Sequence, residues 1–150
     1  MQNPKERIER TICGCGECSS HCHRAPGYTL PGEIAQIAEY LGKENVEQFT
    51  EEYFVASKRT RVLIGQDQYI IPTLSPRMEN GHCVFLNDAG ECSIHAVSPY
   101  GCAYFDAHQP QAEAYRNSRA GLNYLVHCLE NTEEGAEYIN TWDKLNQQVA

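Results

Sequence analysis

The sequence predicts a small, α-rich α+β domain with about four helices and one or two short β-hairpins. Three observations indicate this class. Apolar residues recur at helical spacing in four stretches, and two pairs of short apolar runs flank turn-forming residues. No internal repeat or linker divides the 150 residues, a length that suits one compact domain. We therefore expect a single domain over residues 1–150, with a cysteine-cluster core at 13–108 and C-terminal helices at 110–150.

Two helices are expected after a polar lead-in and a cysteine-dense loop over residues 13–27. The first helix has Pro31 near its start and Gly42 just past its end. Its apolar stripe is Leu30, Ile34, Ile37, Ala38 and Leu41. In the second helix, Asn45 followed by Gln48 resembles a capping box. The stripe of that helix is Val46, Phe49, Tyr53 and Ala56.

Two hairpins are expected in the middle of the chain. In the first, residues 62–64 and 69–71 are apolar and flank a turn at 65–68. Pro72 and Pro76 are then expected to bound a loop. The second hairpin places residues 83–86 and 91–94 around the turn-forming sequence Asn-Asp-Ala-Gly at 87–90. Pro99 and Gly101 are expected to break regular structure before Cys102.

Two more helices are expected after Pro110. Along the first, Gly121 costs about 1 kcal/mol relative to alanine. Its apolar face is Tyr115, Ser118, Leu122, Leu125 and Leu129. The last helix is expected to begin near Asn131, with Glu134 three residues on. Its buried face is expected to be Tyr138, Trp142, Leu145 and Val149.

The charge balance excludes several classes of partner. Twelve basic against 20 acidic residues give a net charge of −8, which argues against binding of duplex nucleic acid. No apolar run approaches the roughly 20 residues that cross a bilayer, and residues 1–10 lack the apolar stretch of a secretory signal. We expect a cytoplasmic protein with no nucleic-acid or membrane partner, while a protein partner stays open. The basic run at 58–61 is expected to be solvated surface rather than a phosphate site.

The eight cysteines are the unusual feature of the composition. In a secreted chain they would indicate disulfides, whereas in a reducing cytosol thiolates more plausibly hold metal. One group reads C-x2-C-x3-C followed by histidine, at Cys15, Cys18, Cys22 and His23. The other is Cys83, Cys92 and Cys102, of which the first two are expected to lie close together across the second hairpin. Folding must bring the two groups together across the 60 residues that separate them.

These residues resemble the bacterial CxxCxxxCC cysteine-cluster family, also called YkgJ-like, which is described as zinc- or iron-chelating. The similarity covers roughly residues 15–105, and its other matching segments are Pro26-Gly27-Tyr28, the IAxxLG sequence at 37–42, Cys83-Val84-Phe85-Leu86, Cys92-Ser93-Ile94-His95 and Pro99-x2-Cys102. The resemblance implies that the metal ligands are Cys15, Cys18, Cys22, Cys83, Cys92 and Cys102. His23 stands where the family has its second adjacent cysteine, and because imidazole can replace thiolate at zinc, His23 is a further candidate ligand.

Other candidates are weaker. Cys13 lies beside the first group, and His108 follows Cys102 closely enough to bind or orient a metal. His95 is expected to pack near the cluster, and Cys128 is expected to be a small apolar residue of a helix. No nucleotide-binding, protease or hydrolase pattern occurs, so no catalytic constellation is identified.

The sequence therefore predicts a metal-binding protein that chelates zinc or iron through two cysteine clusters, in a structural or metal-handling role. Zinc is favoured because it accepts mixed cysteine and histidine shells, with iron or an iron–sulfur cluster as the alternative cofactor. The family also occurs in proteins linked to flagellin lysine methylation. That link implies an alternative function, an iron or iron–sulfur enzyme acting in protein modification. A thiol–disulfide role for Cys15 and Cys18 is disfavoured, because such motifs belong to a βαβ context that is absent here.

Overall fold

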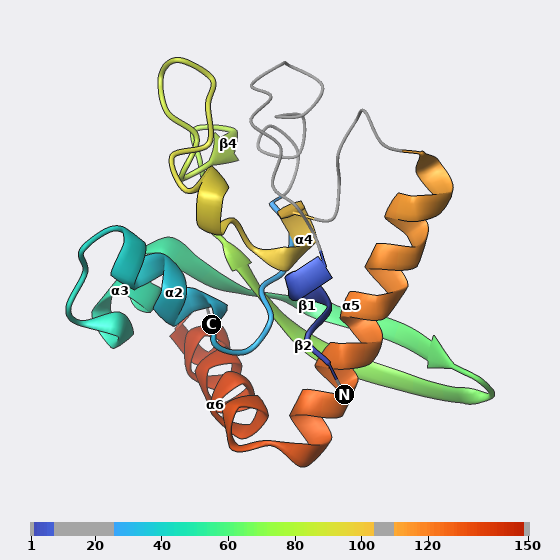
Figure 1. The fold of residues 1–150 in the computed structure, drawn as a ribbon. Coiled ribbons are helices and arrows are strands. Elements are labelled where there is room, and N and C mark those ends of the chain that lie inside the picture. Colours follow the sequence, from blue (N-terminus) through green and yellow to red (C-terminus); the bar gives the residue numbers. More distant parts are fainter. Residues whose placement is uncertain (1, 8–25, 104–109, 149–150) are drawn as a thin grey trace.

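A computed structural model describes residues 2–7, 26–103 and 110–148 (Figure 1). The predicted class is confirmed, with four helices of seven or more residues and two antiparallel two-stranded sheets in the described residues. The longer helices are α2 (Glu33–Tyr40), α3 (Val46–Tyr53), α5 (Gln111–Asn131) and α6 (Glu133–Gln148). The strands are β1 (Phe54–Ile64), β2 (Asp67–Pro76), β3 (Met78–Glu79) and β4 (His82–Cys83). Short helical turns are η1 (Pro4–Arg7), η2 (His95–Val97) and α4 (Tyr100–Ala103).

The two predicted helices at 30–56 are present, but the second ends earlier than expected. The Asn45 side chain accepts a 3.0 Å hydrogen bond from the Gln48 amide, which confirms Asn45 as the cap of α3. Phe54 turns the chain into an extended conformation directly after Tyr53. Ala56 therefore lies on β1 opposite Leu74, and its expected place on the helix is corrected.

The first hairpin is confirmed and is longer than predicted. Its turn is centred on Gly65, whose φ of 62° favours glycine, and the pairing continues back to Phe54 and Pro76. The expected loop between Pro72 and Pro76 is wrong, because these residues continue β2. Pro72 has no N–H to donate, and it lies where the register shifts between Ser57 and Thr60 on the partner strand. The irregularity is what allows a proline inside the hairpin.

The second predicted hairpin is only partly present. Leu86 and Cys92 form an isolated bridge around a turn in which the Asn87 side chain accepts from the amides of Ala89 and Glu91, each at 3.0 Å. Cys83 belongs instead to β4 and pairs with Met78. The Asn87 side chain takes up backbone amides that could otherwise pair between strands, so residues 83–86 and 91–94 do not form two regular strands.

The hydrophobic core lies between the β1–β2 hairpin and the helices (Figure 1). Trp142 of α6 donates from Nε1 to the Ser57 carbonyl at 2.9 Å, and the Arg59 guanidinium lies 4.8 Å from its ring centroid. Tyr138 and Leu145 are buried as predicted, while Val149 lies outside the described residues. The cap of α6 is Thr132, whose Oγ1 accepts from the Gly135 amide at 2.9 Å, and not Asn131. Aromatic rings extend the core toward β4, namely those of Phe49, Tyr53, Phe54 and Phe85.

Gly121 has a packing role that outweighs its low helix propensity. A Cβ at this position would lie 2.1 Å from Cε1 of Tyr100, a fully buried residue of α4. The predicted helix face is partly right: Leu125 is completely buried, whereas Tyr115 is 63% exposed. Gly121 thus lets α5 approach the short helix that carries Cys102.

No described helix combines the length and the apolar character that a membrane span requires.

Candidate metal centre

The structure describes three of the predicted cysteine ligands. Cys83 is buried on β4, Cys92 is half-buried after the 87–90 turn, and Cys102 is half-buried on α4. None of them forms a disulfide. Cysteine sulfur is a soft ligand that suits both zinc and iron, so the chemistry of this donor set fits either metal.

Cys102 lies against the segment that follows the first cysteine group. The Gly27 amide donates to the Cys102 sulfur at 3.1 Å, and the Gly101 amide donates to the Tyr28 carbonyl at 2.8 Å. The backbones are so close that a Cβ on Gly27 would lie 2.0 Å from the Gly101 carbonyl carbon. The Gly27 amide thus donates to the atom through which Cys102 would bind a metal ion.

The short helix α4 also corrects one prediction. Gly101 does not break regular structure, because it lies inside α4 together with Cys102. The Pro99 carbonyl accepts from the amides of Cys102 and Ala103, both at 2.9 Å. Proline suits the start of a helical turn, since its missing N–H would have no intrahelical acceptor there. This turn fixes the direction in which Cys102 leaves the backbone.

Glu33 joins the segments on both sides of this contact and was missed by the sequence interpretation. Its side chain is 2% exposed, and its Oε1 accepts from the amides of Leu30 at 2.7 Å and Tyr100 at 2.9 Å. Its Oε2 forms an ion pair with Lys5. The available signal was the spacing of Leu30 and Glu33, since a glutamate in the first turn of a helix often reaches back to an amide three residues earlier.

The described residues do not by themselves assemble a complete site. Among residues 2–7, 26–103 and 110–148, no group of three His, Cys, Asp or Glu side chains could hold a metal ion. Cys92 pairs with Leu86 and Cys83 with Met78, so these two cysteines are not cross-strand partners. The predicted ligands Cys15, Cys18, Cys22 and His23, with Cys13 and His108, lie outside the described residues.

The structure also describes His95 and Cys128, two weaker candidates, and His82, which precedes Cys83. His95 begins η2, and the His82 Nδ1 lies 2.9 Å from the Cys83 carbonyl oxygen. Cys128 is 3% exposed inside α5, where its carbonyl accepts from Thr132 Oγ1 at 2.8 Å. The position of Cys128 on a packed helix is what a small apolar residue would occupy.

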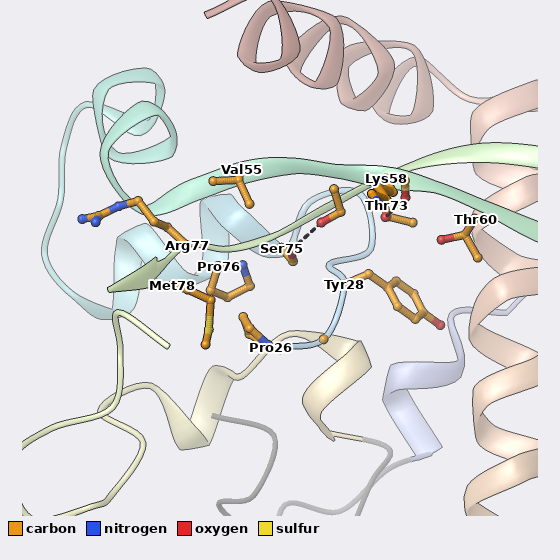
Figure 2. A pocket seen from close by; sticks show the side chains of 12 residues that line it. Pro26, Tyr28, Val55, Lys58, Thr60, Thr73, Ser75, Pro76, Arg77 and Met78 are labelled. Carbon is orange, nitrogen blue, oxygen red and sulfur yellow. Dashed lines mark hydrogen bonds between the residues drawn. The ribbon is translucent and has the colours of Figure 1, made fainter. Parts of the chain in front are cut away.

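A hollow of about 650 Å³ lies beside the Gly27 contact (Figure 2). Its walls are the 26–28 segment and the ends of β1 and β2, and its twelve lining residues include Lys58 and Arg77 but no carboxylate. Arg77 is engaged elsewhere, since its Nε donates to the Glu52 carbonyl at 2.8 Å. The hydroxyl groups of Ser57 and Ser75 lie 2.5 Å apart on the strand side. The volume is within the range of small-molecule sites, about 300–1,000 Å³.

Comparison with known proteins finds one family. The sequence model of the CxxCxxCC family, described as "Putative zinc- or iron-chelating domain", matches residues 14–128. This range includes both cysteine groups and extends into α5. No curated protein and no solved structure matches the chain.

Proposed function

The chain belongs to the CxxCxxCC family of zinc- or iron-chelating domains, and we propose that it binds one of these metals through both of its cysteine groups. The observation that carries the proposal is the hydrogen bond from the Gly27 amide to the Cys102 sulfur. This hydrogen bond connects Gly27, which follows the first cysteine group in the sequence, to Cys102, which belongs to the second group.

Chain length supports a shared site. Cys22 is five residues from Gly27, and five residues span at most about 18 Å. The first group is therefore tethered within reach of Cys102, although 79 residues separate Cys22 from Cys102 in the sequence. We propose Cys15, Cys18, Cys22, Cys83, Cys92 and Cys102 as the sulfur ligands.

A histidine completes the proposed ligand set. The family name CxxCxxCC describes the spacing of four cysteines. When the first two are aligned with Cys15 and Cys18, the third corresponds to His21 and the fourth to Cys22. The sequence interpretation chose His23 as the substituted position, so both histidines are candidates. Zinc accepts mixed cysteine and histidine shells, and this tolerance favours zinc over iron.

The role that we propose for the metal is structural or metal-handling, in the cytosol, where thiols stay reduced. A bound zinc ion would supply a positive charge that holds the two thiolate-bearing segments together. Six thiols exceed the four ligands of one structural zinc ion, so either two ions share sulfurs or some thiols stay outside the shell.

An iron or iron–sulfur enzyme of protein modification is the second candidate, and the hollow favours it. A space of about 650 Å³ offers room for a substrate group, and its wall includes Gly27, whose amide donates to the Cys102 sulfur. We rank this role second because the described residues around the hollow form no catalytic constellation.

Elemental analysis and an absorption spectrum of anaerobically purified protein test the proposal. Colourless protein with one or two zinc ions per chain supports the first role. Brown protein with iron and acid-labile sulfide supports the second. Protein without zinc or iron, which also fails to take up either metal after reduction of its thiols, would refute both.

A further inference from the structure

Glu33 is the charged residue most deeply buried in the described part of the chain. Its carboxylate has three partners on three segments: Lys5 on η1, the Leu30 amide before α2, and the Tyr100 amide at the start of α4. A buried carboxylate without such partners would be strongly destabilising, and hydrogen bonds between a charged group and N–H donors are stronger than neutral ones. The three contacts therefore stabilise the buried carboxylate of Glu33, and through them Glu33 connects the three segments.

These segments are the ones that flank the proposed ligands. Lys5 precedes the first cysteine group in the sequence and Leu30 follows it, so Glu33 binds described residues on both sides of the segment that carries Cys13, Cys15, Cys18 and Cys22. Tyr100 is two residues before Cys102 on the same helical turn. A single carboxylate oxygen, Oε1, accepts hydrogen bonds from the amides of both Leu30 and Tyr100.

A second feature supports this interpretation. The Gly27–Gly101 approach lies immediately beside the Glu33 contacts, since Gly27 is three residues before Leu30 and Gly101 follows Tyr100. The amide-to-sulfur bond of Gly27 and Cys102 thus depends on the alignment that Glu33 sets. Residues that orient metal ligands without touching the metal commonly change metal affinity 10- to 100-fold when they are mutated.

We propose that Glu33 is a positioning residue for the metal centre: it holds the residues that flank the N-terminal cysteine group in sequence against the turn that carries Cys102. This role rests on the proposed metal function, and Glu33 itself is not a ligand. The hydrogen bonds from the Leu30 and Tyr100 amides set the distance between the segments before α2 and at the start of α4. The ion pair with Lys5 neutralises the buried charge and holds η1 beside them.

Cobalt(II) titration of the full chain tests this role, because sulfur-to-cobalt charge-transfer bands report both affinity and ligand geometry. Glu33→Gln keeps an oxygen that can accept from the two amides but loses the ion pair. Glu33→Ala loses all three contacts. We expect the alanine variant to bind cobalt at least 10-fold more weakly with altered bands, and the glutamine variant to fall between it and the unmodified protein.

A control variant separates positioning from general destabilisation. Leu145→Ala removes a buried side chain of α6 that takes no part in the hydrogen bonds or the ion pair of Glu33, and should lower the melting temperature while leaving cobalt affinity and bands unchanged. If Glu33→Gln and a folded Glu33→Ala bind cobalt as the unmodified protein does, the positioning role is wrong. If the alanine variant does not fold, Lys5→Met and Glu33→Gln decide: unchanged bands in both would refute the role. If the unmodified protein shows no charge-transfer bands, the proposed function itself fails.

Discussion

The Gly27 amide donates a hydrogen bond to the sulfur of Cys102 across 3.1 Å, although 74 residues lie between them in the sequence. The contact is made by main chain on one side and a thiol on the other. Substitutions at several points around it distinguish a metal-supported fold from one that is stable without metal.

Removal of the metal is expected to destabilise the fold. A site built from two distant segments does not exist in the unfolded chain, so binding energy becomes folding energy. With free metal at 100 times the dissociation constant, the stabilisation is about 2.7 kcal/mol, on the order of 10 °C in melting temperature. Calorimetry before and after chelation, with metal content verified, measures it. An unchanged melting temperature in fully demetallated protein would contradict a structural role.

The cysteines are expected to divide into two kinds. Cys102→Ser and Cys92→Ser should lower the bound metal, because an alcohol is a poor substitute for a thiolate ligand. Cys128→Ser is the matched control, since Cys128 is equally unbridged but lies inside α5. Its metal content should equal that of the unmodified protein. Equal loss in all three variants would show that this division is mistaken.

Gly27→Ala is expected to destabilise the protein by about 1–3 kcal/mol, toward the upper end of the range for overpacking. The added Cβ meets the Gly101 backbone at 2.0 Å, and backbone cannot rotate away as a side chain can. Gly65→Ala is a useful comparison: Gly65, in the turn of the first hairpin, has open space but a φ of 62°, so it measures conformational strain alone. Chemical denaturation of both variants compares the two effects, and only the change at Gly27 should also weaken metal binding.

Gly121→Ala is expected to destabilise, even though alanine is favoured over glycine by about 1 kcal/mol inside a helix. The new Cβ would lie 2.1 Å from the buried Tyr100 ring. Ala120→Gly, the neighbouring change in α5, provides a reference for propensity alone, because Ala120 is only partly buried. A higher denaturant midpoint for Gly121→Ala would contradict this prediction. It would mean that α5 can move away from Tyr100 without loss of stability.

The ion pairs between α3 and α6 are expected to make stability pH-dependent on the acid side. The hydrogen bond and charge of Lys144 lower the pKa of Glu47 below its ordinary value of 4.5. A carboxyl whose pKa falls on folding contributes stability above its unfolded pKa and loses that contribution as the pH falls through the folded pKa. Lys144→Met should therefore flatten the acid limb of a melting-temperature profile below about pH 5. The effect should be small, because both side chains are exposed. An unaltered limb would refute it.

Much of the fold was predictable because its signals are local. The Asn45 cap, the turn at Gly65 and the buried face with Tyr138 and Trp142 follow from spacing over a few residues. The loop expected after Pro72 was wrong because a distant feature, the irregularity between Ser57 and Thr60, accommodates the proline. Propensity within one segment cannot show such compensation by another strand.

The site was less predictable than the fold for the same reason. The family resemblance implied the candidate ligands, but the role proposed for Glu33 depends on the amide of Tyr100, 67 residues away. Gly121 likewise reads as an unfavourable helix residue until its contact with Tyr100 is seen. Long-range contacts of this kind leave no periodic pattern in the sequence.

The β1–β2 hairpin has no third strand in the described part of the chain, and its tip projects past α5 (Figure 1). Leu63 and Ile70 lie on one face near this tip and are 59% and 56% exposed. Such an edge could recruit a strand from another molecule and begin aggregation. The cations at positions 58, 59 and 61 lie along β1, where like charges on two approaching hairpins would repel each other. We therefore expect neutral residues at positions 58 and 61 to lower solubility more than stability, whereas Arg59 also contacts the buried ring of Trp142.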